Sequence, residues 1–246
     1  MERAKKNIST WLFLYGLAFA FFQVVPALIS GMWRSPITQG DALDFLTPLA
    51  VVPILLGVYT RIKVQLPGKG TAPFSRVASG ICLVVGVIEY VDGHGIHLPS
   101  NSLSRLLEEG TSVFRAAYLY DEVISHYIWD GGVILISAGL ILLAARLKPG
   151  YLTKREGFWL AAGAALYGFT FFANGIEGQT VLMTFPAAAV GFGVSVYLFL
   201  REVRTGSANP VLAFYGLGYL VSVVLFATWG IVHSGFPEFS ALGWIS

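Results

Sequence analysis

The sequence has few charged residues. Asp, Glu, Lys and Arg make up only 12% of its 246 residues, about half the ~25% share of an average soluble domain. Hydrophobic residues account for 55% of the chain, and its mean hydropathy is +0.69. This composition excludes a soluble globular protein, a disordered chain and a nucleic-acid-binding domain. We therefore expect lipid to surround most of the chain.

Several residue types and motifs of known chemistry are also missing. A single cysteine, Cys82, excludes an intramolecular disulfide framework and a cysteine-rich metal site. The long apolar runs contain no lysine, so a retinal Schiff base has no attachment point. The sequence has no Gly-x-Ser-x-Gly element, no phosphate-binding loop and no dinucleotide-binding glycine pattern.

Long apolar runs dominate what is present. A run of about 20 residues in a helix crosses a hydrocarbon core of about 30 Å. Seven runs meet this length: 11–33, 41–60, 77–97, 122–145, 156–176, 180–200 and 211–233. They are too long for barrel strands and do not alternate in polarity, so helices are expected. The sequence predicts an all-α, polytopic membrane protein, a seven-transmembrane-helix bundle that forms one domain over residues 1–246. We expect a kink in the second span, which contains Pro48 and Pro53.

The basic residues are distributed unequally between the two ends of the spans. Thirteen of the 16 Lys and Arg lie in the N-terminal tail and in alternate loops, which leaves Arg34, Arg105 and Arg115 on the other side. The positive-inside rule then places the N-terminus in the cytoplasm and the C-terminus outside. We expect a multi-pass protein of a prokaryotic plasma membrane. All four histidines lie in the outer half.

Counting residues along each span gives the depth of its polar groups. At about 1.5 Å per helical residue, four spans each bring one polar side chain to a level about 30 Å above the inner surface. These side chains are His97, His126, Glu177 and His233. Glu89 and Asp130 lie about 7 to 12 Å deeper on the same scale. The counts predict a polar layer that faces the outside.

Helical spacing places some of these groups on shared faces. Glu89 and His97 are eight residues apart with Gly93 between them, which predicts one face of the third span. Glu122, His126 and Asp130 have the same spacing on the fourth span. His94 and His97 are three apart and fit one ion if their segment is helical.

Imidazoles and carboxylates together favour zinc, iron or copper over calcium or magnesium. A catalytic zinc needs about three protein ligands and an open position. We predict His97, His126 and His233 as ligands, with His94 as a further candidate. Glu122 or Glu89 would act as the general base on metal-bound water. Four acidic residues are candidates to orient the ligands: Asp130, Glu177, Asp92 and Asp121.

Seven spans that carry histidines and carboxylates resemble the heptahelical membrane metal hydrolases of the alkaline ceramidase and adiponectin receptor type. The resemblance covers the architecture. In that group, the last helix carries two histidines four residues apart, whereas here it carries His233 alone and the close pair is His94-x-x-His97. The resemblance implies zinc-dependent hydrolysis of an amide or ester bond in a lipid.

We therefore expect a metal-dependent membrane enzyme, a zinc hydrolase that acts on a lipid or another amphiphile at the outer leaflet. One alternative is a redox enzyme with iron, copper or haem held by the histidines. Another is a non-catalytic membrane subunit that docks a partner through its outer polar layer. Membrane lipid is an expected partner in each case, and nucleic acid is not.

Two further expectations concern the outer surface. Leucines spaced at i, i+3 and i+4 predict a short amphipathic helix within residues 98–114, lying on the membrane surface. Eight aromatic residues are expected to form an outer anchoring belt: Trp33, Tyr90, Tyr118, Tyr120, Tyr127, Trp129, Trp229 and Trp244.

Overall fold

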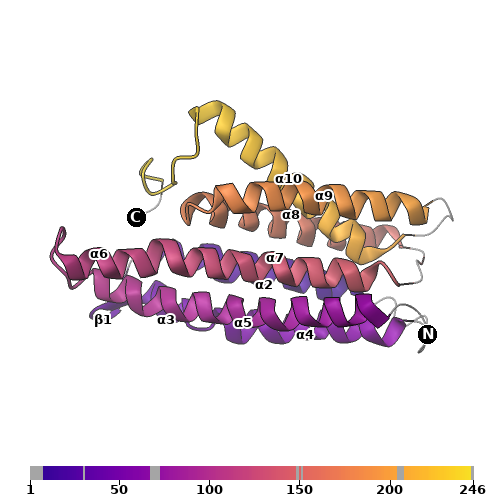
Figure 1. Cartoon of the computed structure of the whole chain (residues 1–246), viewed down its shortest axis with the longest axis horizontal. Helices are drawn as coiled ribbons and strands as arrows, with labels where there is room; N and C mark the ends of the chain where they lie inside the picture. Colours follow the sequence, from indigo (N-terminus) through magenta and orange to yellow (C-terminus); the bar gives the residue numbers. More distant parts are fainter. Residues whose placement is uncertain are drawn as a thin grey trace.

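The computed structural model of this protein describes residues 8–29, 31–66, 73–147, 150, 152–203 and 208–244. Seven helices in this part of the chain are long and apolar enough to cross a membrane, as the sequence predicted. They form an all-helical bundle with one short hairpin (Figure 1). A multi-pass membrane protein is the architecture that these helices support.

The elements follow one another in the order α2 (Ile8–Ala27), β1 (Met32–Arg34), β2 (Ile37–Thr38), α3 (Gln39–Asp44), α4 (Thr47–Gln65), α5 (Pro73–Ser104), α6 (Ser112–Tyr118), η1 (Leu119–Ser125), α7 (His126–Ala144), α8 (Lys154–Glu177), α9 (Val181–Val203) and α10 (Pro210–His233). Strands β1 and β2 pair in an antiparallel hairpin. The second span consists of α3 and α4, and the fourth consists of α6, the π-helical segment η1 and α7.

The helices are arranged in layers (Figure 1). Helices α4 and α5 lie on one side of the bundle, α8, α9 and α10 lie on the other, and α2 and α7 lie between them. Helix α7 packs most extensively along α5, and α2 packs along α8. The third and fourth spans, which carry His94, His97 and His126, therefore run side by side.

Buried tyrosines connect the layers in the middle of the bundle. Tyr15 of α2, Tyr167 of α8, and Tyr215 and Tyr219 of α10 are all buried. The ring centroids of Tyr167 and Tyr215 are 5.5 Å apart, and the Tyr167 hydroxyl donates to the Tyr219 hydroxyl over 3.4 Å. Tyr219 also shares a hydrogen bond with the hydroxyl of Ser137 on α7. Since hydrocarbon offers no partner to a buried hydroxyl, these bonds stabilise the contact between the layers.

The second span breaks where the sequence predicted a kink. Helix α3 ends at Asp44, and α4 begins at Thr47 with Pro48 in its first turn. Proline has no backbone N–H, so it fits the first turn of a helix, whereas in the interior it removes one backbone hydrogen bond and kinks or breaks the helix. The break therefore lies just before Pro48, while Pro53 lies inside α4.

The prediction of a short amphipathic helix on the membrane surface within residues 98–114 is wrong. Helix α5 instead continues to Ser104, and a turn leads directly into α6. The Arg105 guanidinium, just after α5, lies 2.5 Å from the carboxylate of Asp41 at the start of α3. This ion pair fixes the C-terminal end of α5 against α3, so the segment stays with the bundle.

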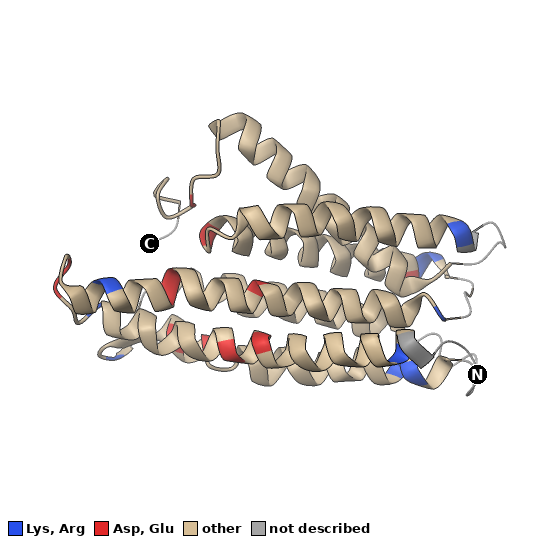
Figure 2. Cartoon of the chain, viewed as in Figure 1, with Lys and Arg blue, Asp and Glu red and all other residues tan. Residues whose placement is uncertain are grey.

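Charged residues separate along the bundle axis (Figure 2). Lys and Arg gather at the end where the described chain begins, and most Asp and Glu lie in the opposite half. In the described ranges, seven basic residues lie at or near the joined helix ends α4–α5, α7–α8 and the end of α9: Arg61, Lys63, Arg76, Arg146, Lys154, Arg155 and Arg201. This separation matches the unequal basic loops of the sequence.

A substitution in α8 tests the close packing of α2 on α8. A Cβ atom added at Gly163 would lie 2.7 Å from the Cα of Phe13, and backbone cannot move aside cheaply. We expect Gly163→Ala to lower the free energy of unfolding by about 1–3 kcal/mol. The measurement is thermal unfolding of the full chain in detergent.

Gly157→Ala is the matched control on the same helix. A Cβ there meets nothing within 4 Å, so this variant should unfold no more easily than the original chain. Equal destabilisation by both substitutions would contradict the packing argument.

Candidate functional site

Three of the four histidines meet in the half of the bundle away from the basic helix ends. The ring centroids of His97 on α5 and His126 on α7 are 5.1 Å apart. The indole ring of Trp129 contacts both of them and also His94, at centroid distances of 5.9, 5.8 and 4.7 Å respectively. We call these four side chains the histidine cluster.

Two carboxylates of the π-helical segment η1 lie against the cluster. The Asp121 Oδ1 atom is 2.8 Å from His97 Nδ1, and the Glu122 Oε2 atom is 4.0 Å from His126 Nε2. The first pair is close, but its atoms are not aligned for a hydrogen bond. It is therefore a charge contact when His97 is protonated.

His94 binds the broken end of the second span. Its Nε2 atom lies 2.9 Å from the Asp44 carbonyl oxygen and 3.4 Å from the Asp44 carboxylate. In a continuous helix that carbonyl would accept from the residue four positions on, which is Pro48 and has no N–H. The break thus leaves a carbonyl free, and the protonated nitrogen of His94 donates to it. The tautomer with the proton on Nε2 follows from this contact.

Glycine allows the helices that carry the cluster to approach closely. A Cβ atom at Gly93 on α5 would lie 2.6 Å from the Ser125 carbonyl oxygen and 2.6 Å from the backbone nitrogen of Trp129. At Gly178, just after α8, it would lie 2.6 Å from His126 Nδ1. Neither position has room for a side chain. As a result, α5 lies close against the helix that carries His126, and the end of α8 lies against the His126 ring.

The π-helical segment also shapes the site. Such segments are rare, and they frequently occur at functional sites because the wider turn redirects side chains. Here Asp121 is buried and faces His97, while Ser125 is buried and its hydroxyl donates to the Asp121 carbonyl. The segment therefore brings a carboxylate to His97 that a regular helix would direct elsewhere.

Polar side chains from other helices lie beneath the cluster. The ring of Tyr90 stacks on His94 at 6.5 Å, and its hydroxyl accepts from the Gln23 side chain over 3.4 Å. The Asn174 amide donates to Gln23 over 3.2 Å. This chain links α5, α2 and α8 below the histidines.

The site is partly exposed at the protein surface. The side chains of Glu122, His97 and His126 are 30%, 18% and 13% exposed, whereas those of Asp121 and His94 are 4% and 1% exposed. His97, His126 and the adjoining Glu122 therefore reach the protein surface, whereas Asp121 and His94 do not. This arrangement permits proton exchange with water at one edge of the site.

Two other predicted site residues, His233 and Glu177, lie outside the cluster. The ring of His233 contacts Trp229 and Trp244, with centroids 4.2 and 6.4 Å away. Helix α10, which His233 ends, inclines away from α5 and α7 (Figure 1). The Glu177 carboxylate accepts from the backbone N–H groups of Phe239 and Ser240 over 2.8 and 3.3 Å, and so holds the C-terminal segment.

The remaining acidic candidates are also separate. The Asp130 carboxylate accepts from the Thr180 hydroxyl over 2.5 Å and thereby joins α7 to the start of α9. Glu89 lies beside Gly131, and Asp92 is exposed. Within the described ranges, neither Glu89 nor Asp92 has a hydrogen bond or an ion pair.

The donor geometry does not fit the predicted metal centre. Across the described residues, no group of three His, Cys, Asp or Glu side chains is placed to hold one ion. His97 Nδ1 faces Asp121, and His94 Nε2 faces the Asp44 carbonyl, so these nitrogens do not converge. The set His97, His126 and His233 is not assembled.

Three members of the site were missed or misread in the sequence. Asp44 precedes the uncharged part of the second span, yet it lies 17 residues before Arg61, about 25 Å from the basic end, which is close to the level of the histidines. Trp129 and Tyr90 were assigned to an exposed aromatic belt, but both are buried and contact His94. Their belt assignment is wrong, because spacing alone does not distinguish a lipid-facing ring from a buried one.

No protein-family model matches this chain, and no curated protein or solved structure is similar to it. The resemblance to the heptahelical metal hydrolases therefore stays a prediction from architecture.

A pair of glycine variants tests whether close approach of α5 assembles the cluster. We expect Gly93→Ala to push α5 away from Ser125 and Trp129, and to lower the free energy of unfolding by about 1–3 kcal/mol. Gly95→Ala, two residues on, meets nothing within 4 Å and should leave it unchanged or higher. Thermal unfolding in detergent measures both. A Gly93→Ala protein as stable as Gly95→Ala would contradict the close contact.

Proposed function

We propose that this protein is an integral membrane enzyme that hydrolyses an ester or amide bond of an amphiphile at the histidine cluster. The observation that carries the proposal is the His97–Asp121 pair, at 2.8 Å, beside His126 in a partly open site. A carboxylate that orients an imidazole is the arrangement by which histidine acts as a general base.

We also propose the orientation that the basic residues indicate. The end rich in Lys and Arg faces the cytoplasm, and the histidine cluster lies toward the outer surface (Figure 2). An amphiphile in the outer leaflet would then present its polar group at the depth of the cluster. This supports a lipid-like substrate over a fully water-soluble one.

The chemistry requires only water and the residues of the cluster. His97 takes a proton from a water molecule as the water oxygen attacks the carbonyl carbon of the substrate, and Asp121 stabilises the resulting imidazolium. His97 then delivers this proton to the leaving oxygen or nitrogen as the carbonyl C–O or C–N bond breaks. The products are a carboxylic acid and an alcohol or amine. His126 lies beside the reacting group, with the Glu122 carboxylate 4.0 Å from its Nε2 atom.

The cluster also has unused hydrogen-bonding capacity. His94 Nδ1 and Trp129 Nε1 are buried and have no hydrogen-bond partner within the described part of the protein. A buried polar atom without a partner costs about 1–3 kcal/mol. Binding of a polar substrate group would remove part of this cost, which supports a ligand-binding role for the cluster.

Replacing the base tests the proposal directly. We expect His97→Asn and Asp121→Asn to lower kcat by about 10²- to 10⁴-fold, the usual contribution of general acid–base catalysis. Hydrolysis is measured in detergent with long-chain p-nitrophenyl esters and a fluorescent N-acyl sphingosine. Glu108→Gln, on an exposed turn, is the control and should leave kcat unchanged. The proposal would be refuted if the unsubstituted protein cleaved none of these substrates. It would also be refuted if His97→Asn kept full activity.

Chelation distinguishes this mechanism from the zinc-dependent one that the sequence favoured. No step above uses a metal, so we expect activity to survive dialysis against a chelator. Elemental analysis of the same samples gives the zinc content. Activity that is lost on chelation and restored by zinc would instead support metal-dependent hydrolysis, with a rearranged set of ligands from the cluster.

A further inference from the structure

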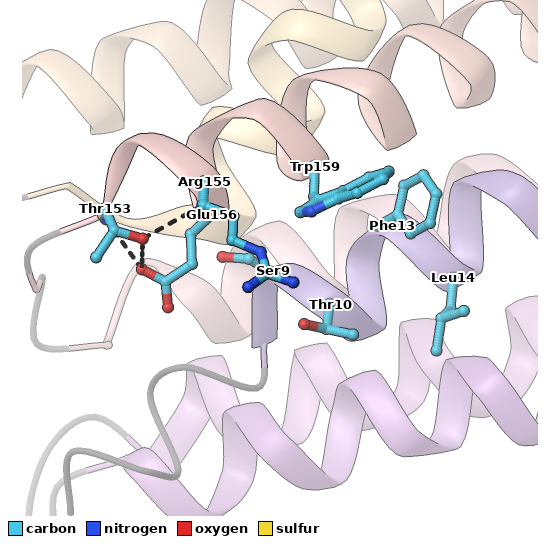
Figure 3. Close-up of a pocket in the computed structure, with 8 residues that line it drawn as sticks. All are labelled: Ser9, Thr10, Phe13, Leu14, Thr153, Arg155, Glu156 and Trp159. Atoms are coloured by element: carbon cyan, nitrogen blue, oxygen red, sulfur yellow. Dashed lines mark hydrogen bonds between the residues drawn. The ribbon is translucent and has the colours of Figure 1, made fainter.

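A groove lies at the opposite, basic end of the bundle, between the start of α2 and the start of α8. Its volume is about 500 Å³, within the range of ligand pockets. Figure 3 shows that its polar side chains, Ser9, Thr10 and Arg155, gather toward the helix ends. Its apolar side chains, Phe13, Leu14 and Trp159, lie one turn further along the same two helices.

The positive charge of Arg155 is available in this groove. The neighbouring Glu156 carboxylate accepts from the backbone N–H and hydroxyl of Thr153 over 2.9 and 2.7 Å, as part of the capping box that starts α8. Arg155 is exposed and has no ion pair with any residue in the described ranges. Its guanidinium extends from α8 toward Ser9 on α2 (Figure 3).

A buried hydroxyl in the same groove also has no partner. Ser9 is 1% exposed, and its Oγ atom has no hydrogen bond within the part of the chain that the structure describes. Such a group is costly to bury in an apolar environment unless a ligand or water satisfies it. The first turn of α8 adds the positive end of a helix dipole at this place.

The apolar part of the groove opens sideways toward lipid. Phe13 and Trp159 pack with their ring centroids 4.8 Å apart, and Trp159 and Leu14 are 41% and 38% exposed. Trp side chains are enriched where headgroups meet acyl chains. The groove therefore presents a cation and hydroxyls at headgroup depth, and aromatic and aliphatic side chains at acyl-chain depth.

We infer that this groove binds one anionic phospholipid of the leaflet at the basic end of the bundle. The phosphodiester would lie between Arg155 and the hydroxyls of Ser9 and Thr10, with an acyl chain along Phe13, Leu14 and Trp159. Charge complementarity selects an anionic headgroup over a zwitterionic one. This site lies at the other end of the bundle from the histidine cluster and is independent of the proposed hydrolysis.

Native mass spectrometry of the full chain, released from detergent, tests the site by titration with dioleoyl phosphatidylglycerol or dioleoyl phosphatidylcholine. We expect one phosphatidylglycerol to bind more tightly than phosphatidylcholine. Arg155→Gln should weaken this first binding event about fivefold, the effect of ~1 kcal/mol per basic residue. Lys154→Gln is the matched control, because Lys154 is the adjacent basic residue and does not line the groove; it should leave the affinity unchanged.

Three outcomes would overturn the inference. Equal weakening by Arg155→Gln and Lys154→Gln would mean diffuse attraction to the basic end. Equal affinity for the two lipids would remove the charge selection. Displacement of the lipid by millimolar inorganic phosphate would assign the polar end to a free anion.

Trp159→Ala provides a second variant. It should weaken phosphatidylglycerol binding severalfold, and an unchanged affinity would contradict the acyl-chain contact.

Discussion

The close contact between α5 and α7 is the constraint on which the candidate site depends. Hydrocarbon gives no hydrophobic drive for two helices to associate, so small residues and close packing hold them together. A Cβ at Gly86 would lie 2.8 Å from the Gly132 carbonyl oxygen, and one at Gly93 would meet Ser125 and Trp129 in the same way. The helices therefore touch backbone to backbone along much of their length. Their histidines meet as a consequence of this contact.

Irregular backbone supplies the rest of the cluster. In lipid, a backbone group released from its helix must find another partner inside the protein. The break before Pro48 releases the Asp44 carbonyl, and His94 binds it. The π-helical segment η1 directs Asp121 toward His97, and the Ser125 hydroxyl binds the Asp121 carbonyl. Both irregularities interrupt the regular hydrogen bonding of a membrane-spanning helix, and both lie at the same site. Since π-helical segments are frequent at functional sites, this supports a functional origin.

Sequence reasoning predicted the seven spans because hydropathy and length are local properties of a chain. Residue counts also placed His97 and His126 at one level, and their rings are 5.1 Å apart. The same count placed His233 at that level, but it measures distance along one helix and gives no lateral position. Helix α10 is inclined, so its last residue lies with Trp229 and Trp244 instead. Asp121 was named as a candidate to orient a histidine, whereas the turn that directs it to His97 has no local sequence signature.

The side chains of the candidate site are buried to different degrees, unlike those of a purely structural polar network. A polar network that only stabilises a membrane bundle is best closed, with each group bonded and none reaching water, as with Asp130 and Thr180. The candidate site differs, because His97 and His126 reach the protein surface while Asp121 and His94 are held inside. Fixing the buried partner and exposing the imidazole keeps the ring oriented and lets it exchange protons. The packing of α5 against α7 alone does not require that combination, and our proposal of acid–base chemistry rests on it.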